Sequence, residues 1–173
     1  MQMLLDFIII LLHRLKFKII KRLQTRLLKM SQSRPPDFTV GQRYLKRWYI
    51  IPRNPFFNIY YHVFGASDDP RFLHDHFYIN CSIILEEEYK EHMVDGIHTR
   101  KEGDIVIRLP KTLHRIEIPE GKIVTSLFIT GPRVRMWGFQ IDKIERNWLG
   151  WKTKAGWMKR DDYLAKYGTN PNI

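Results

Sequence analysis

The chain has 173 residues, a length that suits one domain with an appendage. Because 44% of the residues are hydrophobic and 27% are charged, the composition is that of a folded protein and excludes a disordered chain. Its single cysteine excludes an internal disulfide framework and favours a reducing, cytoplasmic setting. A net charge of +11 would ordinarily point to nucleic acid or an anionic membrane. More than half of that excess lies in residues 1–30, which hold seven Lys or Arg against one acid, Asp6.

Residues 1–30 predict a basic amphipathic helix. Positions 3–12 are almost wholly apolar, but the run is shorter than the about 20 residues that cross a bilayer, and no basic flank of a signal peptide precedes it. From there to residue 27 an apolar residue recurs every four positions, with Lys and Arg on the other sides. The apolar series is Leu11, Leu15, Ile19, Leu23 and Leu27.

Two interpretations of this helix stay open. It could lie on an anionic membrane surface, which would make the protein peripherally membrane-associated. It could instead pack on the following domain or on a second subunit, as in a homodimer, which is the commoner use of an amphipathic helix. Nucleic-acid binding is disfavoured, because the basic, aromatic-rich chain contains no recognised reading motif.

Residues 31–43 predict a linker, since Pro35 and Pro36 break the helix. From residue 44 to 140, runs of aromatic and β-branched residues alternate with turns and predict an all-β barrel or sandwich. The expected strands are 48–51, 58–64, 74–85, 89–92, 97–101, 105–108, 114–118 and 122–130. The aromatic segment 141–173 is expected to pack on the outside of the barrel, with a short helix near 161–167.

The candidate site begins with His74 and His76. Side chains alternate faces along a strand, so these two histidines share one face while Asp75 between them points to the other. His114 begins a later strand after a comparable turn. A third imidazole from a neighbouring strand would complete one face of a metal site.

These residues resemble the motifs of the cupin superfamily, small double-stranded β-helix (jelly-roll) barrels that bind metal. His74 and His76 match the His-x-His of the first cupin motif. In the second motif, Gly103 matches the glycine turn and His114 matches the metal-binding histidine. The resemblance covers about residues 45–140. It departs where the first motif has a glutamate, because Asn80 or Cys81 stands there instead. The resemblance therefore implies a metal held by three histidines alone.

Within the cupins the pattern is similar to the thiol dioxygenases, which hold Fe(II) on three histidines. That branch can have a cysteine where other cupins have glutamate, and in this chain Cys81 lies near that position. The resemblance implies that Arg53 pairs with the carboxylate of a small acidic or thiol-bearing substrate, a role open also to Arg115. It implies Fe(II) as the metal, with Zn, Ni or Mn as alternatives. A planar guanidinium suits such a carboxylate.

Three functions are compatible with these residues. The first is a non-haem Fe(II) dioxygenase-like enzyme. The second is a cupin without redox chemistry, either an isomerase-type enzyme or a ligand-binding sensor. The third is a structural cupin tethered to a membrane or a partner by its helix. Arg108 and Arg115 could each line the barrel mouth and bind an anion, or could be exterior charges.

Overall fold

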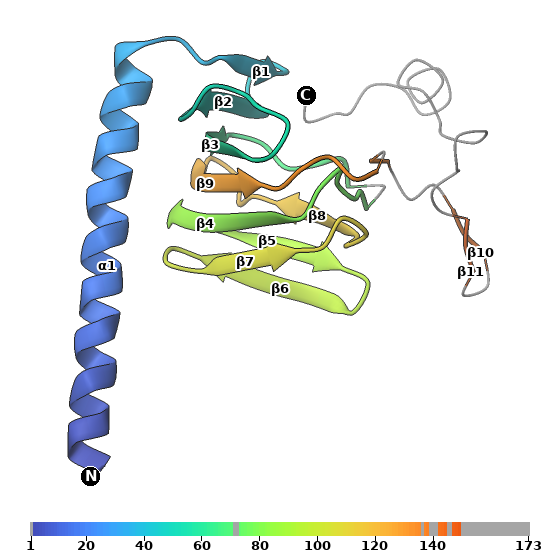
Figure 1. Ribbon diagram of the computed structural model, residues 1–173. Coiled ribbons are helices and arrows are strands. Elements are labelled where there is room, and N and C mark those ends of the chain that lie inside the picture. Colours follow the sequence, from blue (N-terminus) through green and yellow to red (C-terminus); the bar gives the residue numbers. More distant parts are fainter. Residues whose placement is uncertain (1, 71–72, 136, 139–141, 145–146, 150–173) are drawn as a thin grey trace.

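The computed structural model describes residues 2–70, 73–135, 137–138, 142–144 and 147–149. These residues form one helix and eleven strands (Figure 1). The elements are α1 (Gln2–Ser33), β1 (Phe38–Val40), β2 (Leu45–Tyr49), β3 (Asn58–Phe64), β4 (Asn80–Glu86), β5 (Glu88–Met93), β6 (Gly96–Lys101), β7 (Ile105–Arg108), β8 (His114–Glu117), β9 (Val124–Thr130), β10 (Asp142–Ile144) and β11 (Asn147–Leu149).

Two antiparallel sheets build the barrel. A six-stranded sheet has the order β1-β2-β3-β9-β4-β7, and a three-stranded sheet has the order β6-β5-β8. Strands distant in sequence pair within them, as β3 does with β9 and β5 with β8. The predicted all-β double-stranded β-helix (jelly-roll) barrel with an N-terminal helix is confirmed.

Local sequence explains most strand boundaries. The predicted β5–β6 hairpin is present, but its two-residue turn is Val94-Asp95 and not Asp95-Gly96, because Gly96 begins β6 and pairs with Met93. Gly96 has a φ of 142°, a conformation that side chains disfavour. The single strand expected over 74–85 is wrong. The structure has a strand only from Asn80, and His74 forms an isolated bridge with His114.

The linker predicted over residues 31–43 needs correction. The helix continues to Ser33, where the hydroxyls of Ser31 and Ser33 donate to carbonyls three residues earlier, before the two prolines end it. β1 then begins at Phe38 and pairs with β2. The six-stranded sheet thus begins inside the segment assigned to a linker.

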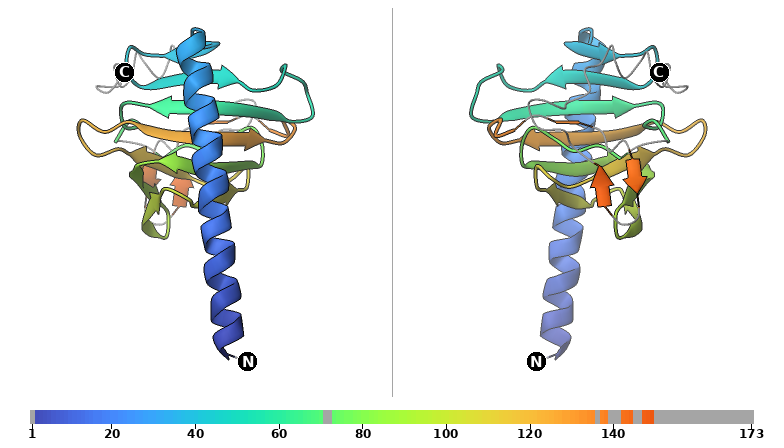
Figure 2. Two further views of the ribbon diagram at one scale, coloured as in Figure 1. Left: turned by 90° about the vertical axis from the view of Figure 1, so that its left-hand side faces the viewer. Right: turned by 90° about the vertical axis from the view of Figure 1, so that its right-hand side faces the viewer.

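Alternation along the strands gives the large sheet two different faces. Its outer face packs against the C-terminal half of α1, and Figures 1 and 2 show the helix lying across that face. The buried members of this outer cluster are Ile20, Leu27, Trp48, Tyr61 and Leu85. Lys21 Nζ pairs with Glu102 at 2.8 Å and fixes the helix against the β6–β7 turn. The packing interpretation therefore holds for this half of the helix.

The other half of α1 projects beyond the sheets (Figures 1 and 2). Leu11, Leu15 and Ile19, which the sequence placed on the packing face, are each more than half exposed. Within the described residues, no helix has a stretch long and apolar enough to span a membrane.

After the barrel, β10 and β11 pair with each other as antiparallel strands. The remainder of the predicted aromatic extension, 150–173, and with it the expected helix at 161–167, lies outside the described residues.

Shortening Leu27 should destabilise the protein, because its side chain is 6% exposed and lies between helix and sheet. We expect Leu27→Ala to lower the free energy of unfolding by about 2–5 kcal/mol, the cost of lost burial plus a cavity. Urea denaturation measures this. The control Leu11→Ala, on the same helix but 55% exposed, should stay within about 0.5 kcal/mol of wild type. Equal losses in both variants would contradict the docking of α1 through its C-terminal half.

Candidate metal centre

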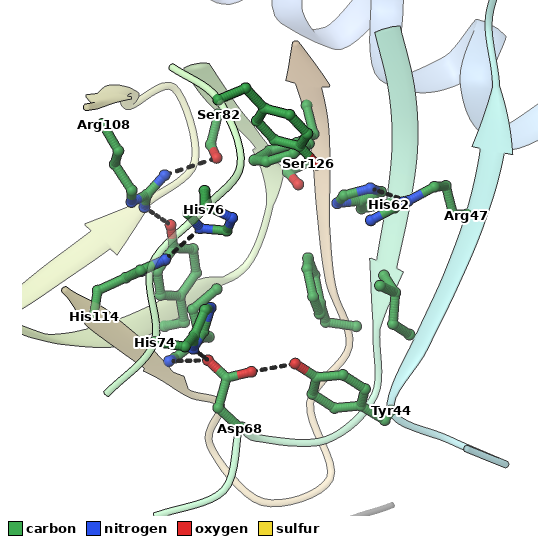
Figure 3. A pocket seen from close by; sticks show the side chains of 16 residues that line it. Tyr44, Arg47, His62, Asp68, His74, His76, Ser82, Arg108, His114 and Ser126 are labelled. Atoms are coloured by element: carbon green, nitrogen blue, oxygen red, sulfur yellow. Dashed lines mark hydrogen bonds and ion pairs between the residues drawn. The ribbon is translucent and has the colours of Figure 1, made fainter. Parts of the chain in front are cut away.

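The three predicted histidines converge inside the barrel. Their ligand atoms all lie within 4.8 Å of one another, and the Nε2 atoms of His76 and His114 are 2.8 Å apart. Paired backbone hydrogen bonds between His74 and His114 bring the loop segment and β8 together. Figure 3 shows the three rings on one wall of a pocket. The sequence spacing thus found the cluster, although His74 and His76 precede β4 and do not lie in it.

All three imidazoles are suited to be neutral ligands. Burial lowers the pKa of His74 and His76, and it lowers the pKa of His114 to about 4 even though the neighbouring Glu91 acts in the opposite direction. Neutral rings keep a lone pair for a metal at physiological pH.

Glu91 orients His114 from behind. This carboxylate on β5 is fully buried, and its Oε1 lies 2.8 Å from Nδ1 of His114. Because a carboxylate only accepts hydrogen bonds, the contact favours the tautomer with Nδ1 protonated and leaves the lone pair on Nε2, which faces His76. Metal-binding histidines typically have such a carboxylate partner.

Two arginines compensate the buried charge of Glu91. Arg108 Nε donates to its Oε1 at 2.5 Å, and Arg100 Nε donates to its Oε2 at 2.6 Å. Burial raises the pKa of Glu91, but the contacts with His114 and Arg108 outweigh it and hold that pKa below the ordinary value. Arg108 also donates to the hydroxyls of Ser82 and Tyr89, at 2.9 and 3.0 Å. Each of its three side-chain nitrogens therefore makes a hydrogen bond within the protein.

A second carboxylate, Asp68, stands behind His74. Its Oδ2 is 3.8 Å from Nδ1 of His74 and accepts a hydrogen bond from the backbone N of Ile116 at 2.6 Å. The Tyr44 hydroxyl donates to Oδ1. Burial and the Asp68 charge raise the pKa of Tyr44 well above its usual value, so the hydroxyl keeps its proton and can donate. The side of His74 that bears Nδ1 thus faces a fixed carboxylate.

Asp75 points away from the histidines, as the alternation predicts. Its Oδ1 accepts from the backbone N of Gly138 at 2.9 Å, and Arg135 forms an ion pair with its other oxygen. The backbone N of Asp75 in turn donates to the Gly138 carbonyl. Asp75 therefore ties the histidine segment to the chain that follows β9.

A divalent cation fits this donor set. Three Nε2-type donors suit Fe, Zn, Ni or Mn, and the carboxylates of Glu91 and Asp68 serve as partners of ligands. Where most cupins have a ligating glutamate, Asn80 is buried on the interior side of β4, and Ser82 of the same face lines the pocket. In the described part of the chain, no carboxylate joins the three histidines in the ligand cluster. His74, His76 and His114 would hold the ion.

The opposite wall of the pocket carries Arg47 and His62 (Figure 3). Arg47 Nε donates to Nε2 of His62 at 2.8 Å, so His62 is neutral with its proton on Nδ1. His62 is 3% exposed and stacks on Phe128, and its Nδ1 has no hydrogen-bond partner. The Arg47 guanidinium lies over the ring of Tyr60 at 4.7 Å. Among the described residues no carboxylate pairs with Arg47, and its terminal nitrogens make no hydrogen bond.

The structure does not bring the other sequence-predicted residues into the pocket lining. Cys81 lies on the outer face of β4, half-buried, and burial raises the pKa of its thiol, which disfavours the reactive thiolate. Arg115 follows His114 on β8, points to the other side, and contacts His92 and Glu117. Arg53 is exposed in the β2–β3 loop over the ring of Tyr49.

Sequence reasoning missed Glu91, Asp68, Arg47 and His62. An available signal was the alternation within β2 and β3, which places Arg47 and His62 on the face opposite Trp48 and Tyr61. No local pattern marks Glu91, since its partners come from β6, β7 and β8.

The pocket itself has a volume of about 150 Å³. A cavity of that size holds a molecule such as benzene. The site therefore suits a ligand with few non-hydrogen atoms.

No family model matches the chain, and no curated protein matches it. Solved structures resemble it in fold alone. A Klebsiella pneumoniae protein with a double-stranded β-helix domain is 14% identical with a TM-score of 0.47, over 58% of this chain and 88% of that one. A cupin family protein from Methanocaldococcus jannaschii is 17% identical with a TM-score of 0.44, over 58% and 91%. A DMSP lyase from Ruegeria pomeroyi is 14% identical with a TM-score of 0.47, over 59% and 54%. The chain thus spans about half the length of that lyase.

Removing the charge of Glu91 should destabilise the protein and loosen metal binding. Glu91→Gln leaves Arg108 buried without its carboxylate, which costs about 3–5 kcal/mol in the free energy of unfolding. Loss of the partner of His114 should weaken metal affinity about 10- to 100-fold. Urea denaturation and metal titration measure the two effects. Glu117→Gln, whose carboxylate pairs with His92 at the surface, is the control and should change stability by about 1 kcal/mol or less.

Proposed function

We propose that the chain is a metal-dependent cupin enzyme of the Fe(II) dioxygenase type, acting on a small substrate with a carboxylate and a second donor such as a thiol. The observation that carries this proposal is the convergence of three neutral imidazoles, without a carboxylate ligand among the described residues, in a small pocket that faces an arginine with free donors.

The ligand set favours dioxygen chemistry. Three neutral histidines leave the full charge of a divalent ion and leave coordination positions open on one side, as in the facial sites of non-haem oxygenases. A bound Fe(II) would supply the redox chemistry, while the protein holds and orients the substrate. Glu91 and Asp68 keep the imidazoles of His114 and His74 in place.

The opposite wall favours an anionic substrate. Glu91 neutralises Arg108, but Arg47 has no such carboxylate, so its terminal N–H groups are available to a ligand. A guanidinium binds a carboxylate through two parallel hydrogen bonds. The Nδ1–H of His62 is a further buried donor without a partner. Arg47 thus takes the carboxylate-binding role that the sequence resemblance gave to Arg53.

Metal content and oxygen uptake test the reaction class. Protein purified without oxygen should contain Fe(II), and His76→Ala should lose most of it, because one of three ligands is gone. His98→Ala, a variant of an exposed histidine in the β5–β6 hairpin, should retain the metal. The loaded wild type should consume dioxygen with at least one member of a panel of small thiol carboxylates.

Two results would decide against parts of this proposal. Equal metal contents in wild type and His76→Ala would contradict the three-histidine centre. Metal binding with no oxygen uptake for any substrate in the panel would favour the alternative without redox chemistry, an isomerase-type enzyme or a ligand-binding protein.

Arg47 should decide the affinity for a carboxylate. In the metal-loaded protein, Arg47→Gln should bind mercaptoacetate about 10- to 100-fold more weakly, as expected for the loss of charged hydrogen bonds. Binding of 2-mercaptoethanol, which has an alcohol in place of the carboxylate, should not change. Isothermal titration calorimetry measures both. Arg53→Gln serves as the matched variant and should shift mercaptoacetate affinity by about threefold or less. The opposite ranking would return the role to Arg53.

A further inference from the structure

The N-terminal half of α1 exposes an unusual amount of apolar surface. Twelve large hydrophobic side chains between residues 3 and 19 are 42–86% exposed. They are Met3, Leu4, Leu5, Phe7, Ile8, Ile9, Ile10, Leu11, Leu12, Leu15, Phe17 and Ile19. Contiguous apolar patches of this kind mark protein or membrane interaction sites.

The distribution around the helix favours a membrane over a protein partner. Asp6 is the one polar residue between positions 3 and 12, so this segment is apolar on every side. A helix from a second copy would cover one stripe and leave the remainder in water. The hydrocarbon of a bilayer surrounds an inserted helix completely.

The length of the apolar segment matches one leaflet. Ten helical residues extend about 15 Å, which is half of the about 30 Å hydrocarbon thickness of a bilayer. Burying Asp6 costs about 2.5–3.5 kcal/mol. Burial of nine large apolar side chains, at about 1.5–3 kcal/mol each, outweighs that cost several times.

Basic residues follow where lipid headgroups would lie. The segment 13–22 contains Arg14, Lys16, Lys18, Lys21 and Arg22 and no acid. Each Lys or Arg near an anionic surface contributes about 1 kcal/mol to binding. The apolar segment and the basic segment are therefore in the order that an anionic leaflet requires.

The barrel leaves this part of the helix accessible. The first buried helical residue is Ile20, and the Lys21–Glu102 pair joins the helix to the sheet beside it. Residues 2–19 project from the barrel (Figures 1 and 2), so they can enter a membrane without undocking.

We propose that residues 2–12 of α1 insert into one leaflet of an anionic membrane, with the basic residues of 13–22 on the headgroups and the barrel held at the surface. This anchoring is independent of the pocket and of its metal. It would place the pocket close to the bilayer on a rigid helical arm.

Vesicle flotation of the full-length protein tests the anchor. Wild type should float with vesicles of phosphatidylcholine and phosphatidylserine, and much less with phosphatidylcholine alone. Ile9→Asp should reduce the bound fraction at least about tenfold, because a charge enters the hydrocarbon. The double variant Lys16→Glu/Lys18→Glu should weaken binding to the anionic vesicles by about tenfold or more. Ile97→Asp is the matched control, since Ile97 is 62% exposed on β6, and it should float like wild type.

Sedimentation of the same proteins without lipid tests the alternative that the helix binds a second copy of the chain. Because Ile9 is 55% exposed, Ile9→Asp should unfold at the wild-type temperature. Absence of flotation in wild type, or equal flotation of wild type and Ile9→Asp, would overturn the proposal. If wild type fails to float and Ile9→Asp converts a larger assembly into monomers, the helix binds a second copy of the chain instead.

Discussion

The buried carboxylate of Glu91 is the interaction on which the site depends. It is fully enclosed and touches the charged groups of Arg108 and Arg100 and the ring of His114. A buried charge is tolerated only when it is paired and hydrogen-bonded. These contacts join β5, β6, β7 and β8. The carboxylate that orients His114, a candidate metal ligand, therefore also links the two sheets. The wall behind the histidines is therefore held by charge pairing, and its geometry cannot relax without exposing an unpaired ion.

The large sheet meets two opposite demands through the alternation of its strands. On the pocket side β2, β3 and β4 present Arg47, His62 and Ser82, which are polar groups that contribute little hydrophobic stabilisation. On the other side the same strands present Trp48, Tyr61 and Leu85 to α1. A second apolar cluster, Ile84, Tyr89, Ile118 and Val124, lies away from α1. Burial of the outer face under α1 adds to the stabilisation from that cluster and offsets the cost of the polar groups in the pocket.

The sequence predicted those features that depend on local pattern. The β5–β6 hairpin and the barrel follow from alternation and turn residues. The predicted histidines do converge, but His74 and His76 lie before β4, in a segment held by one bridge to His114, and not in the strand that the alternation predicted. The sequence did not predict which arginine side chain lines the pocket opposite the histidines. Arg53 was selected by position in a resemblance, whereas the pairing of β2 with β3 brings Arg47 beside His62. The sequence around Glu91 is that of an ordinary solvent-exposed hairpin. Its partners Arg100, Arg108 and His114 become its neighbours only through the pairing of strands. Such contacts carry no signature at short sequence separation.

The balance of charge in the pocket narrows what it can bind. Glu91 cancels Arg108, and the hydrogen bonds of Asp68 with Tyr44 and the backbone of Ile116 occupy that carboxylate. Neutral histidines would leave the charge of a metal undiminished, and Arg47 adds a cation to the facing wall. With a metal bound, both walls of a cavity of about 150 Å³ would therefore attract negative charge. A ligand of that size without acceptor oxygens would leave the Arg47 donors and the buried Nδ1–H of His62 without partners, which costs about 1–3 kcal/mol for each unsatisfied group. In the proposed enzyme, this cost would favour a small anion over ligands that offer no hydrogen-bond acceptor.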